Sequence, residues 1–197
     1  LFSSFTSLVR ETWDNIDRHQ QEIPDELKTD MAAFQAKREH ILTLLKRIYS
    51  KKLDVYKTRI HGNFGLSQIL LTGKDVLLHD FGGNPAKAFS ERRLKGSPLG
   101  DVTAMVRSIY SVAYEGFFTT THVQSSEVAE LLHFADFWAH YISGFFLRAY
   151  LDKVEGHRFV PEAKEDFEVM LQTYLLENSL QYLNNALQKH PGETAIP

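Results

Sequence analysis

The chain has 197 residues, of which 43% are hydrophobic and 12% aromatic, and it carries 22 basic against 25 acidic side chains. This apolar content is sufficient for one core of good size, so a single domain over residues 1–197 is predicted. The net charge of −3 argues against a nucleic-acid-binding protein, which usually carries a basic excess. The absence of cysteine excludes disulfides, thiol catalysis and Cys-ligated zinc.

The sequence shows no sign of a membrane or secreted protein. No run of about 18 apolar residues occurs, and the first residues do not resemble a signal peptide. A cysteine-free chain favours a reducing compartment, so we expect a cytoplasmic protein with neither membrane nor nucleic acid among its partners. The chain lacks an initiator methionine and opens within a helical pattern, so we expect it to be a fragment of a longer polypeptide.

Apolar residues recurring every three to four positions predict helices over most of the chain. A first helix covers residues 1–16, and a second begins at Asp25 after Pro24 and runs to about Tyr49. Three more helices are expected, from Ser97-Pro98 to about residue 112, from near Ser125 to Gly156, and from Pro161 to Pro191.

The middle of the chain has a different character. Ile69–Leu71 and Val76–Leu78 are short apolar runs around a Thr-Gly-Lys-Asp turn, which predicts a β-hairpin. About 16 residues without helical period follow Asp80, and such loops are usually functional. The predicted fold class is therefore α+β, mainly α: a helical bundle with a small hairpin inserted in its middle.

Polar residues flank this hairpin at intervals that match a protein-kinase active site. His61-Gly62-Asn63 precedes the first strand, Gln68 follows Asn63 by five positions, and Asp80-Phe81-Gly82 ends the second strand. Protein kinases place H-R-D-x-x-x-x-N and D-F-G there. The first Asp accepts the proton of the substrate hydroxyl, and the amide and the second Asp hold Mg²⁺. Each group alone is an ordinary loop sequence, but their joint spacing predicts a kinase-like site.

Three segments then resemble one kinase family. HGNFGLSQIL at 61–70 resembles the maltokinase pattern HGDYHLGQVL, and DFGGNP at 80–85 is similar to DFEGEP. SERRLKGSPLGDVTA at 90–104 resembles SERRxKRSPLRDVAG. Maltokinases are aminoglycoside-phosphotransferase-like kinases that often occur fused behind trehalose synthase. The resemblance covers roughly residues 58–115 and is faint over the C-terminal helices.

The resemblance implies the C-terminal lobe of a protein-kinase-like fold. Its expected partners are the other parts of the parent polypeptide, which are a kinase N-lobe and a trehalose synthase catalytic domain, with maltose as a candidate ligand. The chain contains no G-x-G-x-x-G run, and no strand-borne lysine of the V-A-I-K type precedes His61. The N-lobe is therefore expected to be absent from this chain, and ATP to bind only when the lobe is joined to one.

The resemblance also assigns roles residue by residue. Asn63 stands at the catalytic base position, close to His61, and Gln68 and Asp80 correspond to Mg²⁺ ligands. Two protein oxygens imply only weak Mg²⁺ binding. Asp101 corresponds to a carboxylate that braces the catalytic loop, although an acidic residue in the first turn of a helix also stabilises the helix dipole.

The chain departs from the family at its chemical positions. Asn63 cannot accept a proton at neutral pH, and Gly65 and Gly82 replace a His and a Glu. On the last helix, Asn178 and Gln181 stand where a Lys and a Tyr face the sugar in maltokinases. We therefore expect a degenerate lobe with a structural or regulatory role. The alternatives are an active acceptor lobe that forms maltose 1-phosphate and a carbohydrate-binding module.

Other polar and aromatic groups have simpler explanations. One helix face carries a group that matches no recognised metal-ligand spacing, so packed or half-exposed histidines are expected: His133, Asp136 and His140. A basic loop is expected to be solvated or part of an interface rather than a phosphate site: Arg92, Arg93 and Lys95. Aromatic residues at helical spacing predict core packing: Tyr141, Phe145, Phe146 and Tyr150.

Overall fold

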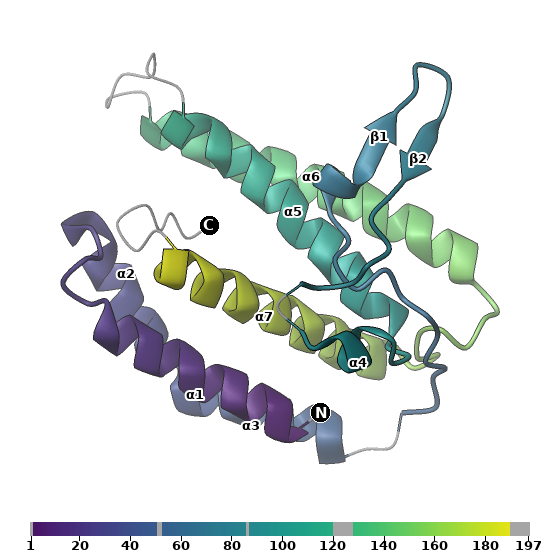
Figure 1. The fold of residues 1–197 in the computed structure, drawn as a ribbon, viewed down its shortest axis with the longest axis horizontal. Helices are drawn as coiled ribbons and strands as arrows, with labels where there is room; N and C mark the ends of the chain where they lie inside the picture. The colour runs from purple at the N-terminus through teal and green to yellow at the C-terminus, as the bar shows by residue number, and fades with distance from the viewer. Residues whose placement is uncertain (1, 51–52, 86, 120–127, 190–197) are drawn as a thin grey trace. The chain divides into compact units, whose positions relative to one another are not determined.

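The computed structural model describes residues 2–50, 53–85, 87–119 and 128–189, which divide into two compact units (Figure 1). The helical unit comprises the described residues within 1–53 and 163–196, and the hairpin unit comprises those within 54–162. The helices of the helical unit are α1 (Phe2–Arg18), α2 (Asp25–Gln35), α3 (Arg38–Ser50) and α7 (Lys164–Lys189). The hairpin unit contains the 3₁₀ turn η1 (Leu66–Gln68), strands β1 (Ile69–Leu71) and β2 (Val76–Leu78), and helices α4 (Phe89–Arg92), α5 (Pro98–Thr119) and α6 (Val128–Val154). The prediction of a single domain stays a prediction.

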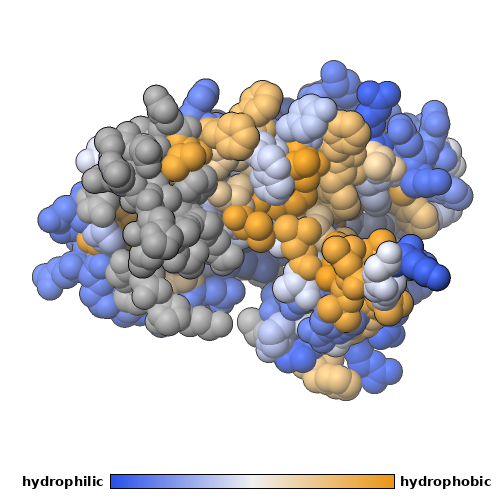
Figure 2. All heavy atoms as spheres, turned by 90° about the horizontal axis from the view of Figure 1, so that it is seen from above, coloured by the Kyte–Doolittle hydropathy of each residue, from blue (hydrophilic) through white to orange (hydrophobic). Residues whose placement is uncertain are grey.

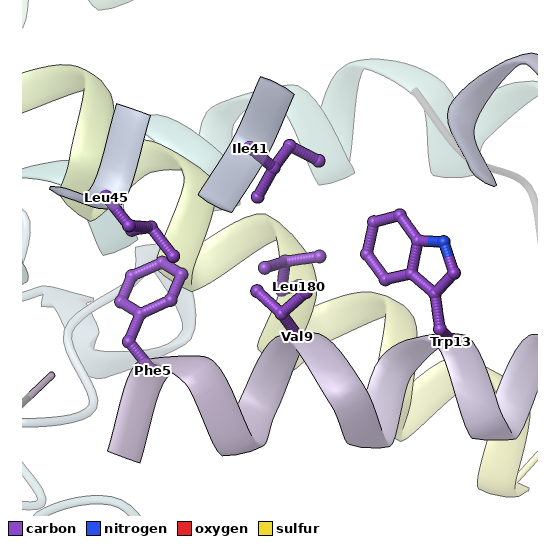
Figure 3. Packing of buried hydrophobic residues seen from close by; sticks show 6 residues of the cluster. All are labelled: Phe5, Val9, Trp13, Ile41, Leu45 and Leu180. Atoms are coloured by element: carbon purple, nitrogen blue, oxygen red, sulfur yellow. The ribbon is translucent and has the colours of Figure 1, made fainter. Parts of the chain in front are cut away.

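The core of the helical unit forms where α1, α3 and α7 pack together. Phe5, Val9 and Trp13 follow one another every four residues, so they lie on one face of α1. They pack against Ile41 and Leu45 of α3 and against Leu180 of α7, as Figure 3 shows. A second buried cluster extends this core: Ile16, Ile23, Met31, Leu183 and Leu187.

The predicted helix from Asp25 to Tyr49 is wrong in one respect, because it is interrupted. α2 ends at Gln35 and α3 starts at Arg38. The Lys37 N–H bonds to the Phe34 carbonyl three residues back, at 2.9 Å, which tightens the turn. The Gln35 carbonyl accepts a 3.0 Å hydrogen bond from the Trp13 indole, so a contact with α1 satisfies the backbone at the break.

The hairpin is confirmed over the predicted residues. β1 and β2 pair antiparallel, with Ile69 opposite Leu78 and Leu71 opposite Val76. The turn between them contains Gly73 at a φ of 85°, a conformation that glycine adopts without strain. The base of the hairpin packs on a cluster of α5 and α6 residues that includes Met105, Ile109 and Ala139.

Most helix boundaries also follow the sequence. α5 starts at Pro98, and its second residue, Leu99, donates its N–H to the Ser97 hydroxyl at 3.3 Å. α7 begins at Lys164 rather than Pro161, and the stretch predicted to lack helical period contains the short helix α4. The predicted starting point near Ser125 and the end at Pro191 lie outside the described residues. Within the described ranges, no helix combines the length and the apolarity needed to cross a membrane.

The prediction that the aromatic residues of α6 pack in the core is wrong for two of them. Tyr141 and Phe145 are exposed, whereas Phe146 packs against the cluster of α5 and α6, and Tyr150 is half-buried. Helical spacing is the reason for the error, since it shows that residues share a face but not which face is covered.

Candidate kinase-like site

The loop that contains Asn63 is held in place by a carboxylate of α5. The Asp101 Oδ2 atom accepts a hydrogen bond from the His61 backbone N–H at 2.6 Å, and its Oδ1 atom accepts one from the Gly62 N–H at 2.8 Å. A carboxylate that binds two successive amides fixes the course of the backbone there, and charge-assisted bonds of this kind are stronger than neutral ones. These are the contacts of a loop brace, the role that the resemblance assigns to Asp101.

His61 connects this loop to the segment that leaves the second strand of the hairpin. Its ring is buried, and its Nε2 atom donates to the His79 carbonyl at 2.8 Å, because a carbonyl oxygen can only accept. The ring centroid lies 5.4 Å from that of Phe64 and 4.8 Å from that of Phe81. These contacts anchor the residue that precedes Asp80 to the loop that carries Asn63.

The hairpin brings the predicted metal ligands to one end of the sheet. The His79 N–H bonds to the Gln68 carbonyl at 3.1 Å, so Gln68 lies opposite the residue that precedes Asp80. Asp80 has a φ of 63°, a left-handed conformation that costs free energy in a residue other than glycine. The fold thus imposes strain at the single acidic residue of the predicted pair.

Glycines let the segments of the site approach one another. A Cβ atom on Gly62, which has a φ of 78°, would lie 3.4 Å from the Cα of Gly83. The Asn63 loop and the segment after Asp80 are therefore in close contact. A Cβ on Gly82 would lie 3.4 Å from the Asp80 Oδ1, so glycine at this position leaves one side of the carboxylate open.

Ser108 is a site neighbour that sequence reasoning missed. Its hydroxyl accepts the Leu66 N–H at 3.0 Å, and a Cβ on Gly65 would lie only 3.1 Å from that oxygen. A larger side chain at position 65 would therefore require Ser108 of α5 to shift. No sequence signal could have identified this contact, since the residues lie far apart along the chain.

The two remaining candidates belong to the helical unit. Asn178 of α7 donates its side-chain amide to the Tyr174 carbonyl at 3.1 Å, and Gln181 donates to the Glu177 carboxylate at 3.3 Å. Both amides are half-buried and bond within their own helix. Their predicted position facing a sugar stays a prediction.

Asp136 and His140, two members of the histidine group on α6, form hydrogen bonds. Asp136 accepts a 3.3 Å bond from the Tyr114 hydroxyl, and the His140 Nδ1 lies 3.4 Å from the Asp136 carboxylate. Burial, and then the negative charge of Asp136, raises the pKa of Tyr114. Among the described residues, no group of three or more acidic residues or histidines could hold a metal ion.

Arg92 has a structural role in the loop after Asp80. Its guanidinium donates to the carbonyls of Lys87 and Pro85, each at 2.8 Å. Its side chain also packs closely on Gly83, whose Cβ would lie 3.1 Å from the Cβ of Arg92. Arg92 therefore orders the loop instead of projecting freely into solvent.

The chemistry available at this site is limited by Asn63. Its side chain is half-buried and offers an amide that donates and accepts hydrogen bonds but takes no proton. Asp80 and Gln68 provide the carboxylate and amide oxygens that suit Mg²⁺. The donor set therefore fits the predicted ion, and with two protein oxygens the ion would keep most of its water ligands.

We expect weak Mn²⁺ or Mg²⁺ binding that depends on Asp80. Asp80→Asn removes the charged ligand and should lower the affinity by about tenfold or more, measured by titration of Mn²⁺ with water-proton relaxation. Asp75→Asn is the matched control, because Asp75 is also an exposed aspartate but lies in the hairpin turn. An unchanged binding isotherm for Asp80→Asn would show that Asp80 holds no metal.

Comparison with known proteins identifies the fold. No protein-family profile matches the chain. Among solved structures, it is similar to glucosamine kinase in crystal form A, with a TM-score of 0.67 and 18% identity, over 94% of this chain and 42% of that one. The complex of glucosamine kinase with glucosamine, ADP and inorganic phosphate gives 0.68 and 18%, over 94% and 43%. Crystal form B gives 0.69 and 17%, over 97% and 43%.

The chain thus spans less than half of the length of these kinases. At this level of identity, the likeness shows the fold. The predicted fold class, a mainly helical, kinase-like lobe with a small hairpin, is confirmed.

Proposed function

We propose that this chain is the acceptor-side, C-terminal lobe of a sugar-kinase-like domain of the maltokinase type. In this proposal it belongs to a trehalose synthase-type polypeptide of maltose and trehalose metabolism, where it has a structural or regulatory role rather than a catalytic one. The motif resemblance around the hairpin and the likeness to glucosamine kinase over nearly the whole chain both support a sugar-kinase lobe.

The observation that carries the proposal is a well-braced loop without its base. Asp101 and His61 hold the loop and the end of the hairpin through bonds of 2.6 to 2.8 Å. Asn63 nevertheless stands where a kinase needs a carboxylate. Losing a general base typically costs about 10² to 10⁴ in rate. A fold that keeps the scaffold and loses the proton acceptor is suited to assembly or ligand sensing.

The metal-ligand positions that this chain keeps would act on a nucleotide through a bound Mg²⁺ ion. Mg²⁺, when bound with ATP, would neutralise the charge of the phosphates. Asp80 and Gln68 would hold this ion at the end of the hairpin, and Asp101 would keep the Asn63 loop beside it. The same preserved ligands support the alternative function, an active acceptor lobe that transfers the γ-phosphate of ATP to maltose.

We expect no ATP-dependent phosphorylation by the purified chain, with maltose or with glucosamine as the acceptor. The chain carries no base at Asn63 and no glycine-rich G-x-G-x-x-G run to cover the phosphates. The measurement is sugar phosphate formation from Mg²⁺-ATP, with Asp80→Ala in parallel. Turnover that disappears in Asp80→Ala would contradict the proposal, because it would come from this site and not from a contaminating kinase. Maltose binding without turnover would favour ligand sensing, or the alternative of a carbohydrate-binding module, over a role in assembly alone.

A further inference from the structure

A row of exposed aromatic side chains runs along one face of α6. Its members are Phe134, Trp138, Tyr141 and Phe145, with Phe137 beside them. They are 65%, 38%, 59%, 63% and 66% exposed, respectively. Figure 2 looks down on α5, α6 and the hairpin and shows apolar side chains gathered on this face. We call these five residues the aromatic row.

The aromatic row is separate from the face that α6 uses within the hairpin unit. Ala135, Ala139 and Ser143 are the buried residues of α6, and Ala139 belongs to the cluster shared with α5 and the base of the hairpin. The rings of the row contact one another, with centroids 5.3 Å apart for Tyr141 and Phe145 and 6.4 Å apart for Phe137 and Tyr141. Exposed apolar patches of this extent mark interaction surfaces.

We propose that the aromatic row binds the same row of a second copy of this chain, with the two α6 helices antiparallel. The spacing of its main members, four, three and four residues, is that of a helix seam that packs against another helix. This spacing is the same when the helix is read in the opposite direction. If the twofold axis passes between residues 139 and 140, Phe134 of one copy lies opposite Phe145 of the other copy. Trp138 of one copy then lies opposite Tyr141 of the other copy. A twofold interface requires this self-complementarity.

The exposed area is sufficient for such a dimer. An aromatic side chain buries about 150–250 Å² when fully covered, so the exposed fractions of the five rings correspond to roughly 600 Å² on each copy. Two copies together bury roughly 1,200 Å², which exceeds the roughly 1,000 Å² expected of a specific interface. The row carries no charge, and Arg148 and Asp152 continue the seam beyond Phe145 as a polar rim.

Sedimentation of the full chain over a range of concentrations tests the proposal. We expect a dimer of twice 22.6 kDa. Tyr141→Glu should weaken the dimer by about thirtyfold or more, the effect of losing a central hot-spot residue. Leu71→Glu is the control, since Leu71 is an 84% exposed apolar residue of the hairpin outside the row. Circular dichroism establishes that both variants remain folded.

Cysteine cross-linking tests the orientation, because the chain has no cysteine of its own. Phe134→Cys and Phe145→Cys should form a disulfide-linked dimer when the two variants are mixed. Neither should cross-link with itself, because identical positions are then offset by about 16 Å along the helices. A monomer at every concentration would overturn the proposal and leave the row to a different part of the parent polypeptide. Equal weakening by Leu71→Glu, or self-linking of Phe134→Cys, would also overturn it.

Discussion

Replacement of Asp101 by alanine is expected to release the Asn63 loop from α5. The substitution removes the acceptor of two backbone hydrogen bonds, from His61 and Gly62. Hydrogen bonds to charged groups contribute about 1.5–3 kcal/mol each, and part of this is recovered when water reaches the freed amides. We expect a net loss of about 3 kcal/mol of local stability, which corresponds to an about hundredfold larger population of the open loop.

Amide hydrogen exchange of His61 and Gly62 measures this effect where it occurs. Asp101→Asn is the matched control, because its amide keeps one acceptor oxygen and should cause a smaller acceleration. Asp152→Ala tests a carboxylate on α6 that the structure places outside the loop. If exchange at His61 and Gly62 were unchanged in Asp101→Ala, the two hydrogen bonds to Asp101 would not hold the loop in solution.

The hairpin and the motif could be predicted because their information is local. Val76–Leu78 and Ile69–Leu71 are short apolar runs around a glycine turn, and the structure pairs them antiparallel, as a hairpin requires. The contact of Asp101 with residues 40 and 39 positions earlier was predicted from the family resemblance alone. Charge and spacing by themselves gave an equally good explanation of Asp101, as an acidic residue near a helix N-terminus.

The break at Gln35 could not be predicted, because the contact that satisfies its backbone comes from another helix. The residues from Asp25 to Tyr49 keep a helical pattern, and no proline or glycine interrupts them. The carbonyl at the break bonds instead to the indole of Trp13, a contact between positions 22 residues apart. Tertiary contacts of this kind override local helix propensity.

The exposed position of Tyr141 and Phe145 was missed for a related reason. An apolar stripe predicts that a helix face is covered, but it does not say whether the same chain or another one covers it. α6 buries small residues, Ala135, Ala139 and Ser143, and leaves the five residues of the aromatic row exposed. The sequence signal for an interface was therefore that small residues occupy one face of this helix and large aromatic residues occupy another.

A second large effect concerns the base position. An asparagine at position 63 should hold phosphoryl transfer about 10² to 10⁴ below that of a site with a carboxylate, or roughly 3–5 kcal/mol in activation free energy. Asn63→Asp in the parent polypeptide should nevertheless recover little of this. Orientation of the acceptor supplies much of a kinase's acceleration, and the residues expected to orient the sugar are also replaced, at Asn178 and Gln181.

Maltose 1-phosphate formation by the parent polypeptide, with and without Asn63→Asp, is the most direct test of a lobe that has lost its chemistry. The Asp80→Ala variant, as a background control, identifies activity that comes from this site. We expect no more product from the unsubstituted protein than from the Asp80→Ala background, and a gain of less than about tenfold over that background from the added carboxylate. Strong activity in the unsubstituted protein, or a gain of about a hundredfold or more, would contradict the account and show that the lobe is a working acceptor site.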